Sequence, residues 1–491
     1  MIKCLLVSSS KTVAGFEYAL TLPNGGLSSI AGNIDPDVCE VKVLDLVTVR
    51  FNAESYFKKY ISKNHFDVIG FSCMVFQFYE ILELAKIVRR LNKKALIILG
   101  GYYATVNYKE ILQSDSMRYF DIIVRGEGEN VFRQLIESVD RKLPYESIQG
   151  ISFLQNGVPV HNECGELIDL NTLKIPDRNS RVLKNKFRIM DYKADVVETT
   201  RGCTFTCKYC TITKMYGRSY RKFTIERILK DITDAEKHGA KSILFTDDNI
   251  VLNRKHFEEL CNGIINAGLN KIKYVTQASV QGFVQNPHLP ELMRKAGFEA
   301  VFLGIENDSD EALQFFSKDN QLKSGDTEGV VRALHQQGIF VIGGLILGNP
   351  SDDKESLTKT YEFSKKIALD MVIFFALTPY PGTELREELL KGNYITNLND
   401  YSKYDCYHMN VRTDHLSSFE LFEIYDSFIQ KYYLDSGAIF KVIKNYPLFF
   451  FKSFFVFLYR HPDMVFHHLT KGRWLKNQRR KKYLLQTPVT E

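Results

Sequence analysis

The chain has 491 residues, more than one ordinary hydrophobic core accommodates, so two or three domains are expected. Its 45% hydrophobic and 25% charged residues are typical of a folded soluble protein, and it contains no run of about 18 apolar residues that would span a bilayer. The net charge of +6 equals the surplus of residues 471–491, so the rest of the chain offers no excess of basic residues to nucleic acid. Nine cysteines, an odd number in so long a chain, argue against a disulfide framework.

Residues 1–145 alternate between strand-like and helix-like patterns. Residues 1–9 are too short for a signal-peptide core and are predicted to form the first strand. The predicted strands of this region are 3–7, 39–46, 67–72, 95–99 and 121–124. Such alternation predicts a doubly wound parallel sheet of Rossmann type, in which ligands bind beyond the carboxyl ends of the strands. Three short segments occupy those ends, namely residues 72–73, 100–105 and 126–129, and their glycines permit close approach of backbone to a ligand.

Residues 146–189 are predicted to be a connector. Two short strand-like segments, 151–154 and 158–161, flank Asn156 and Gly157, a pair that favours a two-residue hairpin turn.

The most informative segment is the loop after the next predicted strand, 195–199. It carries Cys203, Cys207 and Cys210, so three thiols fall within eight residues. Thiolates are the soft ligands that iron–sulfur clusters and zinc select. Closed zinc sites take four protein ligands, and no fourth thiol lies nearby, so three ligands with one open position favour a [4Fe–4S] cluster. Three-coordinate zinc and three unrelated cysteines are the alternatives.

At these residues the sequence resembles the radical S-adenosylmethionine enzymes, whose loop reads Cys-x3-Cys-x-aromatic-Cys, with Tyr209 at the aromatic position. The resemblance implies that the fourth iron binds S-adenosylmethionine and that reductive cleavage of this ligand yields a 5′-deoxyadenosyl radical. Reduced thiolate ligands also imply a reducing compartment, so we expect a cytoplasmic protein.

The first domain then resembles the cobalamin-binding domain that precedes many such enzymes. The resemblance assigns to cobalamin the residues Ser72, Gly100, Gly101, Tyr103, Gly126, Glu127 and Gly128. Family members often have His where this chain has Tyr103, and the Asp-x-His-x-x-Gly signature is absent, as is common in radical enzymes of this class. A domain that keeps the fold without the cofactor is therefore the alternative.

Residues 190–385 are predicted to form a partial (β/α)6 barrel, with catalytic groups at the carboxyl ends of its strands. The predicted strands are 195–199, 242–246, 274–278, 300–304, 340–347 and 371–376. The resemblance implies an S-adenosylmethionine pocket formed by Tyr209, Asp247, Asp248, Gln277, Glu306, Gly343 and Gly344.

The individual roles in this pocket stay open at this point. Glu306 is expected either to accept hydrogen bonds from the ribose or the methionine amine, or to form a structural salt bridge. Asp247 and Asp248 either contact the ligand or cap the following helix, and we expect one of them to face the pocket. Gly343 and Gly344 are expected to let backbone approach the ligand.

Residues 386–491 are predicted to be mostly helical. An aromatic segment at 448–459 is predicted either to pack against the barrel or to enter a membrane interface. The basic tail at 471–491 and Trp474 would support interfacial binding to anionic lipid, whereas RNA binding by the tail is the less favoured hypothesis because no RNA-binding fold accompanies it. A peripheral position on the inner face of the membrane is the alternative to a free cytoplasmic protein.

These observations together predict a cobalamin-dependent radical enzyme that methylates an unactivated carbon. The substrate is expected to be a hydrophobic small molecule or lipid, and the electron donor a reductase or flavodoxin-type protein. Cyclisation, coupling or oxidation without methyl transfer is the alternative reaction. A non-catalytic metal or corrinoid carrier tethered to a membrane is the alternative of another class.

Overall fold

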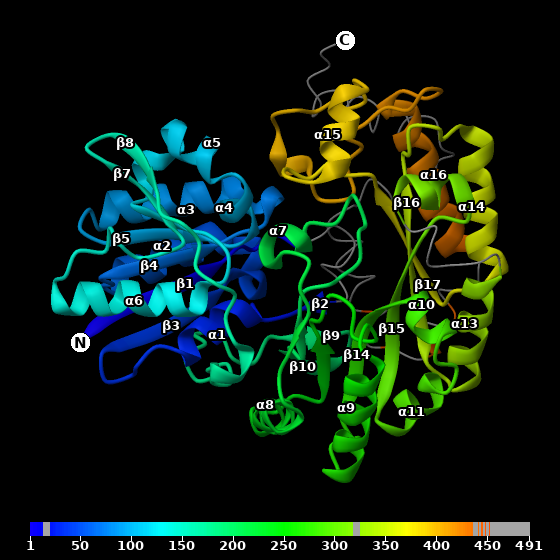
Figure 1. The fold of residues 1–491 in the computed structure, drawn as a ribbon, viewed down its shortest axis with the longest axis horizontal. Coiled ribbons are helices and arrows are strands. Elements are labelled where there is room, and N and C mark those ends of the chain that lie inside the picture. Colours follow the sequence, from blue (N-terminus) through cyan, green and yellow to red (C-terminus); the bar gives the residue numbers. More distant parts are fainter. Residues whose placement is uncertain are drawn as a thin grey trace.

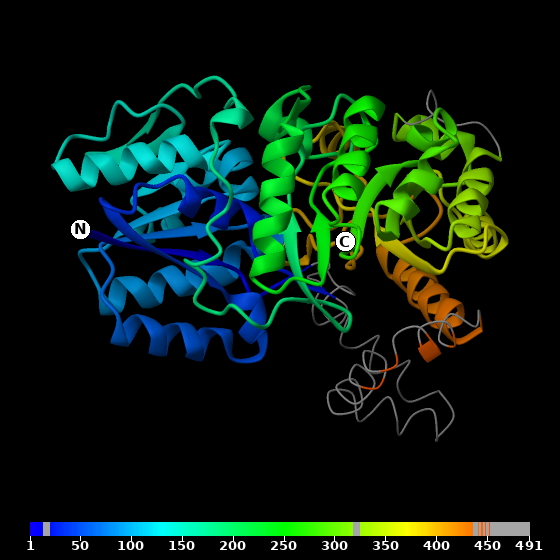
Figure 2. The ribbon, with the colours of Figure 1, turned by 90° about the horizontal axis from the view of Figure 1, so that it is seen from below.

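The computed structural model describes residues 1–12, 20–317 and 325–435, together with five isolated positions between 440 and 451. Two sheet-based units lie side by side, the first formed by the N-terminal third of the chain and the second by the middle (Figure 1). The same arrangement is visible from below in Figure 2. The α/β class with a Rossmann-like sheet and a partial barrel is thereby confirmed.

The first sheet has seven strands in the order β3-β1-β4-β5-β6-β7-β8. Its parallel part consists of β1 (Ile2–Ser8), β3 (Cys39–Asp45), β4 (Val68–Ser72), β5 (Leu96–Gly100) and β6 (Ile122–Val124). The central strands are almost continuously apolar because both of their faces are covered. The predicted hairpin forms as β7 (Ile151–Gln155) and β8 (Val158–His161) and extends this sheet, with β7 antiparallel to β6 and β8 antiparallel to β7.

Helices cover both faces of the first sheet. One core contains Phe57 and Ile81, from α2 and α3, and the other contains Leu27 and Phe132, from α1 and α6. The helices of this unit are α1 (Gly25–Gly32), α2 (Ala53–Lys63), α3 (Phe78–Leu91), α4 (Tyr102–Val106), α5 (Tyr108–Gln113) and α6 (Gly128–Arg141). Short 3₁₀ helices are η1 (Leu46–Asn52), η2 (Val75–Gln77), η3 (Asp115–Tyr119) and, in the connector, η4 (Leu170–Thr172).

The second sheet has eight strands in the order β17-β16-β15-β14-β13-β10-β9-β2. Six of them are parallel and consecutive and form the partial barrel: β10 (Tyr192–Val197), β13 (Ser242–Phe245), β14 (Lys273–Ser279), β15 (Phe298–Glu306), β16 (Phe340–Leu347) and β17 (Met371–Ala376). The antiparallel edge combines β9 (Arg188–Ile189) with β2 (Leu20–Thr21), a segment from the N-terminal region. A separate ribbon pairs β11 (Thr200–Arg201) with β12 (Arg221–Lys222).

Helices α8, α9, α13 and α14 bury apolar faces against this sheet, in a core that includes Ile228, Phe257, Leu334 and Leu357. The helices are α7 (Ile212–Tyr216), α8 (Ile225–Lys237), α9 (Arg254–Asn266), α10 (Val280–Val284), α11 (Leu289–Lys295), α12 (Asp310–Phe315), α13 (Asp326–Gln336), α14 (Lys354–Lys366) and α15 (Glu384–Lys391). Beyond the barrel, η6 (Tyr401–Lys403) meets η2 of the first unit, and α16 (Ser418–Asp435) packs on α14 and β17.

The division of the chain at 145, 189 and 385 stays a prediction. The aromatic segment 448–459, apart from Phe451, and the basic tail 471–491 with Trp474 lie outside the described residues. Within the described part, no helix has the length and apolar character needed to cross a membrane.

Candidate active site

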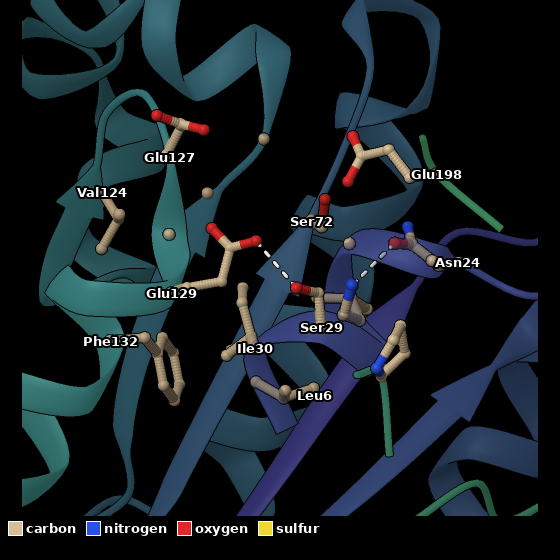
Figure 3. A pocket seen from close by; sticks show the side chains of 18 of the residues that line it. Leu6, Asn24, Ser29, Ile30, Ser72, Val124, Glu127, Glu129, Phe132 and Glu198 are labelled. Atoms are coloured by element: carbon tan, nitrogen blue, oxygen red, sulfur yellow. Dashed lines mark hydrogen bonds between the residues drawn. The ribbon is translucent and has the colours of Figure 1, made fainter. Parts of the chain in front are cut away.

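A cavity of about 330 Å³ lies at the carboxyl edge of the first sheet. Apolar side chains of Leu6, Ile30 and Phe132 line one side, and Ser72, Glu127 and Glu198 line the opposite side (Figure 3). Most of the wall belongs to the first unit, but Glu198 comes from the segment directly after β10 of the barrel. The cavity therefore lies between the two units, at the position where ligands bind in open α/β sheets.

Glycines give this cavity its shape. A Cβ at Gly70 would lie 2.9 Å from side-chain atoms of both Leu6 and Phe132. Gly101 has φ +91°, and a Cβ there would lie 2.8 Å from the backbone of Cys73. A side chain at either position is excluded by the fold, so the backbone itself forms the wall.

The residue types of the wall fit a corrinoid. Glycine backbone and apolar side chains suit the bulk of a large ring or of an aromatic base, whereas the hydroxyl and carboxylate groups suit amide substituents.

Six of the seven residues predicted to bind cobalamin line this cavity: Ser72, Gly100, Gly101, Gly126, Glu127 and Gly128. Tyr103 lies elsewhere. It is the second residue of α4 and points into the core, where its ring centroid is 4.5 Å from that of Phe78 and 5.9 Å from that of Tyr401. The helix begins at Tyr102, and this start turns Tyr103 away from the sheet edge.

Sequence reasoning missed several residues of the cavity, chief among them Asn24, Ser29, Glu129, Glu198 and Arg201. Asn24 caps α1 by accepting a hydrogen bond from the Leu27 amide at 2.9 Å. Ser29 donates to Glu129 Oε1 at 2.8 Å (Figure 3). The sequence contained a signal for Glu129, as the second acid of Gly-Glu-Gly-Glu, and for Arg201, as the cation directly before Gly202 and Cys203.

Burial and the charge of Arg201 have opposite effects on the pKa values of Glu129 and Glu198. Burial opposes ionisation of Glu129, but the charge and hydrogen bond of Arg201 prevail and hold its pKa below the usual value. For Glu198 burial prevails and, despite Arg201, raises the pKa to about 7. The Glu198 side chain keeps 29% of its surface exposed. The Glu198 carboxyl group, with its raised pKa, therefore faces the cavity.

The cysteine loop leaves β11 and ends at α7. Cys203, Cys207 and Cys210 are all half-buried. Burial raises the pKa of Cys210 to about 12, and the charges of Cys207 and Cys203 add to the shift, so the three thiols lie within electrostatic range of one another. The loop is anchored to the end of the barrel by Lys208, whose Nζ lies 2.7 Å from Glu388 Oε1.

The described residues include no group of three or more His, Cys, Asp or Glu side chains placed to hold one metal ion. A [4Fe–4S] cluster binds each thiolate on a different iron, so its ligands need not converge on a single point. Three half-buried free thiols within eight residues of one loop fit that requirement.

Glu306 faces this loop from the end of β15. Tyr209 donates its hydroxyl hydrogen bond to Glu306 Oε1 at 2.8 Å, and Glu306 is 7% exposed. Its φ of +67° lies in the left-handed region, which is uncommon for a residue with a side chain, and the register with β16 shifts between Gly304 and Glu306. Strained backbone held by its surroundings is a feature of binding and catalytic sites.

Asp247 and Asp248, which follow β13, both accept hydrogen bonds from residues near the start of the cysteine loop. The carboxylate of Asp247 is fully buried and accepts hydrogen bonds from the Thr199 hydroxyl at 2.5 Å and the Thr200 hydroxyl at 2.6 Å. Asp248 Oδ2 accepts from the Gly202 amide at 2.9 Å, next to the first cysteine. The Gln277 amide donates to the Asp247 carbonyl at 2.6 Å. These contacts tie the ends of β10, β13 and β14 to the start of the cysteine loop.

Gly343 and Gly344 lie within β16, and side chains already fill the space beside them. A Cβ at Gly343 would lie 2.4 Å from Leu369 Cδ1, and one at Gly344 would lie 2.5 Å from Phe302 Cζ. Close packing is therefore sufficient to require glycine at both positions.

Two family models match the chain. Residues 11–136 match the B12 binding domain, and residues 197–364 match the radical SAM superfamily. The first match contains most of the cavity wall, and the second contains the cysteine loop and four of the six parallel barrel strands, β13 to β16.

Curated relatives cover most of the chain. An uncharacterized methyltransferase of Pyrococcus horikoshii is 28% identical over 92% of this chain and 97% of its own length. The hopanoid C-3 methylase of Methylococcus capsulatus is 26% identical over 79% of this chain and 72% of its own. The anaerobic magnesium-protoporphyrin IX monomethyl ester cyclase of Cereibacter sphaeroides is 26% identical over 78% of this chain and 61% of its own.

The fold is also similar to that of a solved protein. The radical S-adenosylmethionine methyltransferase TsrM of Kitasatospora setae, with cobalamin and a [4Fe–4S] cluster bound, superposes with a TM-score of 0.66 at 17% identity, covering 80% of this chain and 78% of that one.

Proposed function

Because this chain belongs to the radical S-adenosylmethionine enzymes that carry a B12-binding domain, we propose that it transfers a methyl group to an unactivated carbon of an apolar substrate. The observation that carries the proposal is the cavity between the two units. Its wall combines the carboxyl edge of the first sheet with Glu198 and Arg201, the residues that lead into the cysteine loop. A corrinoid held there would lie beside the site of radical formation.

The cofactors supply the radical and the methyl group, and the protein supplies binding, orientation and exclusion of water. Cys203, Cys207 and Cys210 would hold the cluster. Glu306, already an acceptor for Tyr209, presents a buried carboxylate to S-adenosylmethionine. Asp248 would act indirectly, by holding the Gly202 amide and with it the start of the loop.

The proposed reaction balances with two molecules of S-adenosylmethionine and two electrons from an external reductant. The substrate hydrogen leaves in 5′-deoxyadenosine, with release of methionine. The methyl group replaces that hydrogen, and its donor leaves as S-adenosylhomocysteine. A reductase or flavodoxin-type protein is the class of donor that supplies such electrons.

The inner face of the barrel favours an apolar substrate. Phe302 of β15 and Phe375 of β17 are half-buried and meet across Gly344, with ring centroids 6.2 Å apart. Their strand neighbours Leu303 and Phe374 point to the opposite face, into the core under the helices. The relatives named above include an enzyme named for a hopanoid, a polycyclic lipid. We therefore propose a lipid or polycyclic hydrocarbon as the substrate class.

The deciding experiment is anaerobic reconstitution with iron, sulfide and hydroxocobalamin, followed by reduction with methyl-labelled S-adenosylmethionine and a membrane-lipid extract. We expect bound corrinoid, both 5′-deoxyadenosine and S-adenosylhomocysteine as products, and label in the lipid fraction. The Cys207→Ala variant serves as the control that forms neither the cluster nor the radical.

Two results would contradict the proposal. Cluster and 5′-deoxyadenosine without corrinoid or S-adenosylhomocysteine would favour cyclisation, coupling or oxidation, and the cyclase relative makes that the second candidate. Label confined to water-soluble products would refute the lipid substrate while leaving methyl transfer in place.

A further inference from the structure

One arginine joins the wall of the cavity to the cysteine loop. Arg201 Nη1 lies 2.7 Å from Glu127 Oε1, and Nη2 lies 2.6 Å from Glu129 Oε1. Its Nε donates to both carboxylate oxygens of Glu198 at 3.0 Å. The guanidinium thus contacts three carboxylates, and the Arg201 side chain is only 6% exposed.

Two of the three acids that Arg201 binds, Glu127 and Glu129, belong to the other unit. Glu127 and Glu129 come from residues 126–129, and all four residues of this Gly-Glu-Gly-Glu turn line the cavity (Figure 3). Arg221 of the neighbouring strand β12 adds a second contact to Glu127, with Nη1 2.9 Å from Oε2. The two acids therefore hold the β11–β12 ribbon, whose next residues are Gly202 and Cys203.

The contact of Arg201 with the three acids fixes the orientation of the two units as well as joining them. Burying one guanidinium among three carboxylates has a large desolvation cost, and well-packed apolar groups would join the units at least as stably. The planar guanidinium instead fixes the relative orientation of the two units, because each of its nitrogens bonds to a different acid. A shift of the cavity wall by a fraction of an ångström must move Arg201 or break one of these bonds.

We infer that Arg201 is a positioning residue, which sets the cysteine loop in register with the Gly-Glu-Gly-Glu wall and so couples occupancy of the cavity to the geometry of the cluster site. The inference deepens the proposed function and rests on it for the identity of the ligand. Because such coupling is reciprocal, filling either site alters affinity at the other.

Two sets of variants of the full-length protein test the coupling. Arg201→Lys keeps the positive charge but removes the planar guanidinium that bonds several acids at once. The double variant Glu127→Gln, Glu129→Gln changes only residues of the first unit and leaves the cysteine loop and Arg201 as they are. The matched control is Arg181→Lys. Arg181 is another buried arginine, and it bonds to Asp195 of β10, with Nη1 2.7 Å and Nη2 3.0 Å from the carboxylate. It does not line the cavity.

The first measurement is backbone hydrogen exchange in residues 203–211 of cluster-containing protein without corrinoid. Although Glu127 and Glu129 lie in the other unit, we expect their double variant to raise exchange in the loop about fivefold, a change of the size typical for coupled sites. Arg201→Lys should do the same, and Arg181→Lys should leave loop exchange at the wild-type rate. Wild-type exchange in the double variant would overturn the inference, even if Arg201→Lys failed to fold.

The second measurement is the dissociation constant for hydroxocobalamin, determined by visible absorption with and without the cluster. In the wild type and in Arg181→Lys the two constants should differ by about fivefold, whereas in Arg201→Lys they should coincide. Equal constants in the wild type would overturn the coupling. A wild-type protein that bound no hydroxocobalamin would refute the proposed function, and the exchange experiment would still decide the role of Arg201.

Discussion

At the scale of single residues, Glu306 is the side chain whose geometry most favours a direct role with S-adenosylmethionine. A buried carboxylate in a left-handed backbone conformation is costly, and the hydrogen bond from Tyr209 holds this carboxylate beside the cysteine loop. Glu306→Gln should raise the dissociation constant for S-adenosylmethionine about tenfold, because charge-assisted hydrogen bonds are worth about 1.5–3 kcal/mol.

Equilibrium dialysis with unreduced, cluster-containing protein measures this effect. Glu388→Gln is the matched control, since Glu388 pairs with Lys208 on the same loop but at the rim of the barrel. Its affinity should remain that of the wild type. If Glu306→Gln also bound as tightly as the wild type, Glu306 would have only a structural role.

The cysteine ligands give the second prediction at this scale. Cys207→Ala leaves two thiolates in the loop, too few to hold a [4Fe–4S] cluster with one open iron. The variant should lose the broad visible absorption, the bound iron and sulfide, and all formation of 5′-deoxyadenosine. Cys164→Ala, which removes an exposed cysteine of the connector, should retain all three. Normal 5′-deoxyadenosine formation by Cys207→Ala would disprove the cluster assignment.

At the scale of elements, the turn after β16 depends on a buried acid. Asp352 Oδ2 accepts hydrogen bonds from the amides of Gly348 and Asn349, both at 2.9 Å. Burial nevertheless prevails over these bonds and raises the pKa of Asp352 to about 6. Because the folded state binds the proton more tightly than the unfolded state does, this group contributes stability below its ordinary pKa and loses it as pH rises through about 6.

Asp352→Asn removes the titration and keeps an oxygen acceptor. The free energy of unfolding of the wild type, measured relative to this variant, should therefore fall by about 1 kcal/mol between about pH 5 and about pH 7.5. Urea unfolding of cluster-free protein at both pH values measures the difference. A constant difference, or one that grows with pH, would contradict the burial-driven shift.

At the scale of the whole molecule, the charge distribution predicts that residues 471–491 would bind an anionic membrane surface. All of the net charge of +6 can be attributed to residues 471–491, which hold seven cations and one acid. Each basic residue near an anionic surface contributes about 1 kcal/mol to binding. Deletion of 471–491 should abolish sedimentation with phosphatidylserine vesicles and preserve cleavage of S-adenosylmethionine. Unchanged sedimentation would refute a membrane role for the tail.

What the sequence determined by itself is the part encoded by local spacing. The three thiols occupy eight consecutive residues, so the sequence predicts a shared ligand without any knowledge of the fold. Period and alternation likewise predicted both parallel sheets, because a strand buried on both faces must be apolar throughout. The glycine turns at 100–101 and 126–128 were recognisable because strand ends of a parallel sheet share one edge.

Only the tertiary structure decided which neighbours these residues acquire. The start of α4 turned Tyr103 into the core, and the hydroxyls of Thr199 and Thr200 engaged Asp247, some 47 residues distant. Arg201 and Glu129 are 72 residues apart in the sequence and meet only because the two units lie against each other in the fold. Local patterns do not encode such contacts, because their energy comes from desolvated charges that the packing of the whole chain brings together.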